Sequence, residues 1–550
     1  MKRVNFLLIL ILISAFVLRL YQLGKTPIAL EWDEVAIGYD AYSILTTGRD
    51  QFGKFLPLTF RSLDDWKPPI YEYLTVPSIA VFGLNPFAVR LPSALSGILT
   101  VLATYLLTKV IFKQNTVALL AAFFLAISPW HLQFSRAAFE VNLSVAITVF
   151  AALLFLKGLK NPRLFLLSGL LFGLDLFSYH STRVIGPLLM ILMFFLFNKS
   201  LPKRLYVTLF FIIFGFFFAV ALPILTSSEA QIRFKATNIF DPGARYIEEK
   251  DLPKIYLDSR LQDKEAGYEL DGKIFHNQRL IYTDYETLKK AFYKYLSHFN
   301  FEFLFIRGDA PLHHAPGFGL LYLAELPLLV IGLIYMVRRS NNHYFLLILS
   351  WLLIAPIPAS VTREAPHAVR TELILPMFQI ITAAGLVVIL KFIKKESNWV
   401  LWFTLISISF LFVINNSFYL HQYYVHTNYE LSRDWKFGRE EAVNFTESIK
   451  NNYEKILVSL KVDMPYIFWL FYSQYPPIQY LKEGGTVSGG FADERNKFGK
   501  YEFRNFDYRN FTTSGKTLFV GTPGDFPIDS NILKTIYYLD GTEAIKIAEK

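Results

Sequence analysis

The sequence predicts an integral membrane protein, an all-α polytopic bundle of about eleven transmembrane helices with a small α/β domain at its C-terminal end. Composition gives the first reason. Of the 550 residues, 53% are hydrophobic and only 18% are charged, and the mean hydropathy is +0.34, above the level usual for soluble domains. Secondly, apolar runs of roughly 20 residues, enough to cross a hydrocarbon core, recur along the chain. Thirdly, alternate connections between these runs are basic, as in cytoplasmic loops.

The first apolar run follows Lys2 and Arg3 and has some features of a signal peptide. It is long, lacks a small-residue cleavage site and is followed by many similar runs, so we interpret it as the first transmembrane helix. The predicted spans are 5–22, 88–112, 116–134, 139–157, 163–179, 183–198, 204–225, 317–337, 343–358, 372–392 and 398–417.

The positive-inside rule supports this set of spans and gives the chain a cytoplasmic N-terminus. The cytoplasmic connections then all carry Lys or Arg, at 113–115, 157–163, 198–204, 338–342 and 391–398. Outside the membrane lie 23–87, 131–138, 179–183, 226–316, 359–371 and the tail from about 418. The chain is therefore predicted to be a multi-pass protein of the cell membrane. The net charge of +10 comes from basic clusters in the predicted cytoplasmic loops, so it indicates the orientation of the chain in the membrane and does not indicate a nucleic-acid partner.

Two domains are predicted. Residues 1–425 form the transmembrane domain, with the outer loops 23–87 and 226–316, and residues 426–550 form an extracytoplasmic soluble α/β domain.

Local patterns predict structure in the tail and in the first outer loop. The runs 455–462 and 517–523 are typical of strands, and 438–452 is typical of a helix. In the first outer loop, the segment 69–84 is apolar but short and contains Pro77. This combination predicts a helix that lies at the membrane interface.

Three acids follow the first span closely, namely Glu31, Asp33 and Glu34. Acids in this position commonly cap a helix and interact with its dipole. Alternatively, they face a substrate at the outer membrane surface. A Trp-Lys-Pro-Pro segment around Lys67 lies in the same loop, and its prolines make the backbone rigid. The nearby lysine favours the second interpretation.

Cationic side chains recur in the outer segments. Lys67 is able either to snorkel at the interface or to bind an anionic headgroup. Arg90 lies at the outer end of the next span, against the positive-inside tendency, which favours a lipid phosphate partner; pairing with Glu31 or a nearby acid is the alternative. Each of the remaining candidates is, taken singly, more often a turn or helix-end residue: Arg183, Arg307, His367 and Arg370.

Acids on one wall and cations on the other suit a lipid-linked phosphate donor. The cations neutralise the leaving phosphate, while a carboxylate takes the proton of an acceptor hydroxyl or amine.

The sequence contains no phosphate loop, no dinucleotide-binding fingerprint and no HExxH zinc motif. It has no cysteine, and neither His131 with His180 nor His313 with His314 has helical ligand spacing. No metal-binding residues are predicted, although a divalent cation remains open.

Together, these motifs resemble the polyprenyl-phosphate-dependent GT-C glycosyltransferases of the protein O-mannosyltransferase type, a group that includes the aminoarabinose transferase of lipid A. Within this group the chain resembles a bacterial member similar to glycosyltransferase family 39. The resemblance rests on Asp33-Glu34, the Lys67-Pro68 pair and the motifs RLPSALSG, SPWHLQFSRAAFE, YHSTRV, FEFLFIRGD, HHAPGFGLLYLAELPLL and PIPASVTREAPHAVR. It extends to about residue 440. It implies a GT-C fold and a mannosyltransferase-like hexosyl or pentosyl transfer in protein or cell-envelope glycosylation.

The resemblance also implies residue roles. Asp33 would be the catalytic base and Glu34 its partner. Lys67 would contact the donor phosphate, Arg90 would support that site, and the further phosphate-binding candidates are Arg183, Arg307, His367 and Arg370. The implied reaction is a single displacement with inversion, from a polyprenyl-phosphate sugar donor to a protein, lipid or glycan acceptor outside the membrane.

One departure and one alternative remain. Eukaryotic O-mannosyltransferases carry a β-trefoil domain in a large outer loop, and 226–316 is too short to hold one, so the acceptor is not assumed to be a protein.

A transporter or flippase of a lipid-linked sugar would expose similar cations. It should show mid-membrane charges, broken helices or repeat symmetry, whereas the charges here gather at the outer ends of the spans. A structural or sensory protein would not explain the crowded outer loops.

Overall fold

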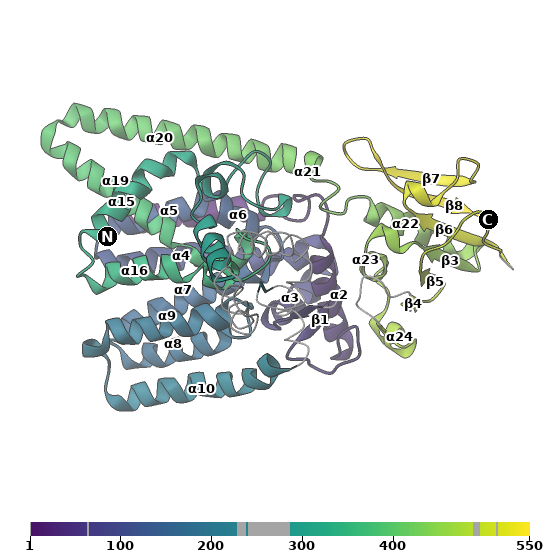
Figure 1. The fold of residues 1–550 in the computed structure, drawn as a ribbon, viewed down its shortest axis with the longest axis horizontal. Coiled ribbons are helices and arrows are strands. Elements are labelled where there is room, and N and C mark those ends of the chain that lie inside the picture. The colour runs from purple at the N-terminus through teal and green to yellow at the C-terminus, as the bar shows by residue number, and fades with distance from the viewer. Residues whose placement is uncertain (1, 63–64, 228–237, 240–286, 488–495, 513–514) are drawn as a thin grey trace, which may run out of the picture.

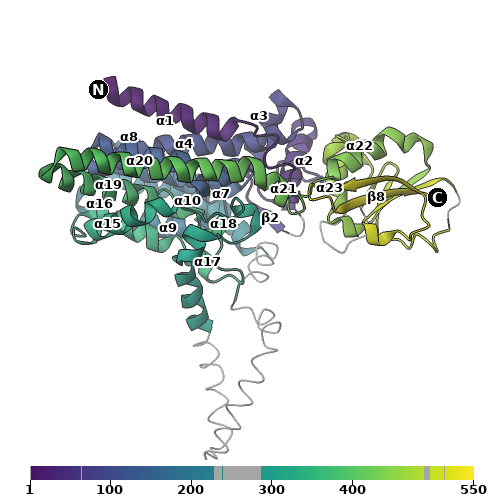
Figure 2. The same ribbon diagram turned by 90° about the horizontal axis from the view of Figure 1, so that it is seen from above.

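A computed structural model describes residues 2–62, 65–227, 238–239, 287–487, 496–512 and 515–550. Long helices lie side by side at one end of the molecule, and a sheet with short helices lies at the other (Figures 1 and 2). The predicted outer loop 226–316 falls largely on residues outside this description.

The apolar runs of the sequence form the long helices of the bundle. Their buried faces build one continuous apolar core. In chain order these helices are α1 (Lys2–Leu20), α4 (Pro86–Phe112), α5 (Asn115–Ile127), α6 (Pro129–Ser135), α7 (Glu140–Gly158), α8 (Pro162–Asp175), α9 (Thr182–Leu196), α10 (Arg204–Thr226), α15 (Leu326–Val337), α16 (His343–Ile354), α19 (Met377–Glu396) and α20 (Asn398–His421).

The predicted number of spans is not confirmed. In the described part of the chain, seven helices are long and apolar enough to cross a membrane, or eight if α5 and α6 are one broken span. The run 116–134, predicted as one span, forms two helices that bend by 58° between Ile127 and Pro129. A proline lacks the amide hydrogen that would continue the hydrogen-bonding pattern of α5.

The first outer loop is folded. It contains α2 (Trp32–Thr47), the hairpin of β1 (Phe60–Ser62) and β2 (Asp65–Lys67), and α3 (Ile70–Phe82). The helix predicted over 69–84 is confirmed as α3, with Pro77 inside it, whereas α2 was not predicted. Gly48 ends α2 in the left-handed conformation, with φ at +69°, which glycine adopts without steric cost.

The C-terminal part contains a six-stranded mixed sheet in the order β4-β5-β3-β6-β8-β7. The two predicted strands are confirmed as β3 and β6, which pair in parallel, and the predicted helix is confirmed as α22. The elements are α22 (Arg439–Ile449), β3 (Lys455–Val458), α23 (Pro465–Tyr472), α24 (Pro477–Lys482), β4 (Lys497–Phe498), β5 (Tyr501–Phe503), β6 (Thr517–Gly521), β7 (Ile532–Tyr537) and β8 (Glu543–Glu549).

The C-terminal part packs directly on the first outer loop. Helix α23 contacts α2, and one apolar core includes Val35 and Ile37 of α2 together with Phe468 and Phe471 of α23. At Gly38 the two helices approach so closely that an added Cβ would lie 2.5 Å from the ring of Phe471. The helix that carries the first acids is therefore held in place by the C-terminal part.

This close approach predicts that Gly38→Ala loosens the contact. Overpacking costs about 1–3 kcal/mol, whereas alanine gains only about 1 kcal/mol over glycine inside a helix. We expect a lower thermal unfolding midpoint and faster proteolytic release of the C-terminal part. Gly186→Ala in α9 is the matched control, because nothing lies within 4 Å of its added Cβ. Equal midpoints for the two variants would contradict the expectation.

Candidate active site

The acids after the first span form the start of α2. Glu31 is the N-cap residue, and its side chain accepts a hydrogen bond from the backbone N–H of Asp33 at 2.8 Å. Glu34 accepts one in return from the backbone N–H of Glu31 at 3.2 Å. Such a capping box satisfies two amides at the helix start. The helix-capping interpretation therefore holds for Glu31 and Glu34 and leaves the carboxylate of Asp33 outside the cap.

The carboxylate of Asp33 pairs with Lys67, the last residue of β2. Lys67 Nζ lies 2.7 Å from Asp33 Oδ1 and 4.0 Å from Glu140 Oε1. The short hairpin places Lys67 opposite Phe60, and Pro68 and Pro69 then lead into α3. Since proline fixes the backbone φ angle, this segment holds the lysine in place. A cation from one outer strand thus lies between acids at the starts of α2 and α7.

Burial and charge make Lys67 an unusual cation. Its side chain is only 5% exposed, whereas that of Asp33 is 49% exposed. Burial by itself would lower the pKa of Lys67, but the carboxylates of Asp33 and Glu140 outweigh it and raise the pKa above its ordinary value. The lysine is therefore charged at any working pH. Its ammonium group has three N–H donors, and Asp33 Oδ1 at 2.7 Å occupies one of them, which leaves donors for an anion.

Glu34 and Arg90 form a second, fully buried ion pair. Arg90 Nε and Nη2 each donate to one carboxylate oxygen of Glu34, both at 2.9 Å. The backbone N–H of Ala138 also donates to Glu34, at 2.8 Å. Arg90 further donates to the carbonyl oxygens of Leu23, Pro27 and Ala29. The structure therefore places Arg90 in the alternative arrangement, paired with a nearby acid.

The remaining predicted cations occupy different surroundings. Arg183 contacts His180, with Nη1 3.1 Å from Nδ1. Burial first, and then Arg183 and Lys67, lower the pKa of His180 to about 3, so this histidine is neutral and lies within the field of Lys67. Arg307 is different, because its side chain is 77% exposed and pairs with Glu302 at 3.4 Å.

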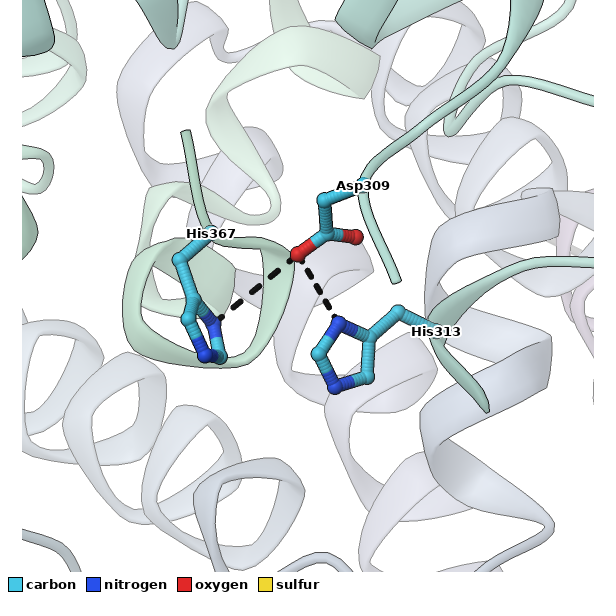
Figure 3. A group of neighbouring side chains, drawn as sticks. All are labelled: Asp309, His313 and His367. Carbon is cyan, nitrogen blue, oxygen red and sulfur yellow. Dashed lines mark hydrogen bonds and ion pairs between the residues drawn. The ribbon is translucent and has the colours of Figure 1, made fainter. Parts of the chain in front are cut away.

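Arg370 and His367 lie in another outer segment. Arg370 donates to Thr362 at 2.8 Å and pairs with Glu364 at 3.3 Å. His367 lies beside Asp309 and His313 in a group that could hold a metal ion (Figure 3). His314, the neighbour of His313, is not part of this group.

Glu140 is the site residue that the sequence reasoning missed. It is 13% exposed on its side chain and begins α7, directly after an outer segment. An acid at the outer end of an apolar run was visible in the sequence, but nothing local connected it with Lys67. Glu140 follows Lys67 by 73 residues in the sequence, and helix α7 brings its carboxylate to the lysine.

Comparison with known proteins places the fold. Residues 66–226, which include Lys67, Arg90 and Glu140, match the family model of dolichyl-phosphate-mannose-protein mannosyltransferases. The chain superposes on the crystal structure of ArnT from Cupriavidus metallidurans in the apo state with a TM-score of 0.55, covering 98% of this chain and 97% of that one at 12% identity. The fold is that of the GT-C glycosyltransferases. The predicted resemblance is confirmed at this level.

Two further similarities concern this chain. The structure of the same ArnT bound to undecaprenyl phosphate also superposes with a TM-score of 0.55, at 13% identity, over 98% of this chain and 97% of that one. The putative mannosyltransferase YkcB of Bacillus subtilis (strain 168) is 28% identical over 166 residues. This match covers 30% of the GT-C chain and 22% of YkcB. It thus spans less than a quarter of the curated relative.

Proposed function

We propose that this chain transfers a sugar from a polyprenyl-phosphate donor to an acceptor outside the membrane, with inversion at the anomeric carbon. The observation that carries the proposal is the buried Lys67 beside the half-exposed Asp33, a cation and a base within 2.7 Å. Support also comes from the ArnT of the same fold, whose structure contains undecaprenyl phosphate. The sugar and the acceptor, whether protein, lipid or glycan, are not specified by these observations.

The proposed mechanism divides the work between two side chains. Lys67 binds the phosphate of the donor and stabilises the negative charge that grows there as the bond to the sugar breaks. Asp33 takes the proton from the acceptor hydroxyl or amine as that atom attacks the anomeric carbon. One bond forms to the acceptor and one breaks to the phosphate oxygen, so the polyprenyl phosphate leaves with the bonding electrons. Attack opposite the leaving group inverts the anomeric configuration.

The neighbouring acids position these two groups. Glu140 contacts the ammonium group of Lys67 from the start of α7. Glu34 and Arg90 hold the start of α2 against α4 and the segment before α7. In the proposed scheme they fix Asp33 in space, and Arg183 acts on the same region through His180. Arg307, His367 and Arg370 remain candidates for a more distant part of the donor site.

Topology and domain roles complete the proposal. The N-terminus is cytoplasmic, and the transmembrane domain, 1–425, opens its site to the outer side. The extracytoplasmic domain, 426–550, packs on α2 through α23, a position from which it is able to cover the site or meet the acceptor. The polyprenyl donor reaches the site from the surrounding membrane lipid.

Donor turnover by the purified full chain tests this function. We would reconstitute the chain in vesicles with a panel of undecaprenyl-phosphate sugars and measure release of undecaprenyl phosphate. Lys67→Met is expected to lower turnover by about 10²–10³-fold, the loss typical of removing one group that stabilises developing charge. Lys54→Met is the matched control, because Lys54 is an exposed lysine of the same outer loop.

Two results would contradict the proposal. One is an absence of turnover with every sugar of the panel. The other is equal turnover by Lys67→Met and Lys54→Met. Movement of intact donor across the bilayer, without loss of its sugar, would favour the transporter alternative.

A further inference from the structure

Three potential ligand side chains from two outer segments meet beside the candidate active site. Asp309 and His313 come from the segment that precedes α15, and His367 begins α18 (Ala368–Thr371) as its N-cap residue. Figure 3 shows the carboxylate of Asp309 between the two imidazole rings. One ligand atom from each residue lies within 4.8 Å of the others. All three side chains are 10–14% exposed.

The distances are close to those around a bound ion. Asp309 Oδ2 lies 2.8 Å from His313 Nδ1, which is a hydrogen bond in this structure, and 3.9 Å from His367 Nδ1. In a tetrahedral site with metal–ligand bonds of roughly 2.0–2.1 Å, neighbouring ligand atoms are about 3.3 Å apart. The two observed distances lie on either side of that value. Side-chain movements of a fraction of an ångström would bring both distances to the tetrahedral value.

The hydrogen bonds leave acceptor atoms facing one another. His367 Nδ1 accepts only a long hydrogen bond, from the backbone N–H of Arg370 at 3.4 Å, so this nitrogen is unprotonated and a cation would take its lone pair in exchange for that weak contact. The carboxylate oxygen that it faces is also an acceptor. Asp309 Oδ1 is buried and has no hydrogen-bond partner in the described part of the chain. Asp309 Oδ2 already accepts from His313 Nδ1 and from the backbone N–H of Ala368, so the acceptor that a cation would newly satisfy is Oδ1.

Surrounding contacts already hold the three ligands in place. The backbone N–H of Ala368 donates to Asp309 Oδ2 at 2.7 Å, and that of His367 donates to His298 Nε2 at 3.2 Å. The ring of His313 lies against those of Phe134 and Phe139. Outer contacts of this kind orient metal ligands and raise metal affinity.

We propose that Asp309, His313 and His367 bind one divalent transition-metal ion of the Zn²⁺ type. Two imidazoles and one carboxylate suit zinc or cobalt better than magnesium or calcium, which prefer all-oxygen ligand sets. Three protein ligands leave a fourth position open, as in zinc sites that bind water or a substrate oxygen. The ion would clamp the Asp309–His313 segment onto α18. Since His313 contacts Phe139, the residue before Glu140, the clamp lies next to the candidate active site.

Metal binding to the full chain tests this inference without any assay of transfer. The purified protein would be stripped with a chelator and titrated with Co²⁺ while its visible absorption is recorded, and bound Zn²⁺ would be counted by elemental analysis. We expect one equivalent of metal, tetrahedral cobalt absorption and a thermal unfolding midpoint that rises on addition of Zn²⁺.

Substitutions locate the ion. His313→Ala and His367→Ala are each expected to weaken Co²⁺ binding by about 100-fold or more, because loss of even an outer partner of a ligand costs about 10- to 100-fold. His314→Ala is the matched control next in sequence. His426→Ala is a second control, because His426 pairs with Glu430 at 3.2 Å near the ring of His421, so it tests adventitious binding at another group of histidine and acid side chains.

Several results would overturn the inference. One is the absence of a saturable site near one equivalent in the wild-type chain. Another is binding that survives His313→Ala and His367→Ala but is lost in His426→Ala. If His313→Ala or His367→Ala does not fold stably, the thermal unfolding midpoint of the wild-type chain decides between the outcomes. A midpoint that does not rise when Zn²⁺ is added contradicts the site.

Discussion

Replacing Asp33 with asparagine is expected to lower the rate of sugar transfer by about 10²–10⁴-fold, the usual contribution of a positioned general base. The amide keeps the shape of the side chain but cannot take the proton of the acceptor. Asp33 is half exposed and lies outside the capping box of α2, and Glu140 remains beside the buried Lys67 as a second carboxylate, so the fold should tolerate the change. Turnover of a polyprenyl-phosphate sugar by the reconstituted chain is the measurement.

Glu430→Gln is a suitable control for Asp33→Asn. Its side chain is 49% exposed, as is that of Asp33, and it also takes part in an ion pair, with His426. Both variants should unfold within a few degrees of the wild-type chain. If Asp33→Asn retains wild-type turnover, Asp33 is not the base and the proposed mechanism is wrong.

The Glu34–Arg90 pair should produce the largest effect on stability. Arg90→Met is expected to lower the free energy of unfolding by about 3–5 kcal/mol, because it leaves Glu34 as a buried carboxylate without its cation. Arg90→Lys should also destabilise the chain, since a lysine cannot make the two parallel hydrogen bonds of the guanidinium group. The thermal unfolding midpoint in detergent measures both effects.

A matched surface pair separates burial from charge. Arg307 is 77% exposed and pairs with Glu302, so Arg307→Met should cost at most about 1 kcal/mol. Replacing both members of the buried pair, with Arg90→Met and Glu34→Leu, should recover part of the lost stability. If Arg90→Met unfolds normally but loses donor binding, Arg90 acts on the phosphate, as the resemblance to the glycosyltransferases implied.

Local sequence patterns were sufficient for much of the architecture. Runs of apolar residues located the long helices, since each run must bury its backbone polar groups in a helix to exist in lipid. The strands β3 and β6 and the helices α3 and α22 were also readable from periodicity and turn residues. The break at Pro129 was missed because length alone cannot distinguish a continuous span from a bent pair.

The sequence by itself determined that the chain is a multi-helix membrane protein with acids after its first span and Lys67 in the same loop, because composition and short spacing decide these properties. Only the tertiary structure decided which charges meet. It joined Glu140 to Lys67, assigned Arg90 to Glu34, left Arg307 at the surface and brought His367 to Asp309. These partners lie more than 50 positions apart or on different helices, and helix packing, which brings such residues together, leaves no trace in local sequence spacing.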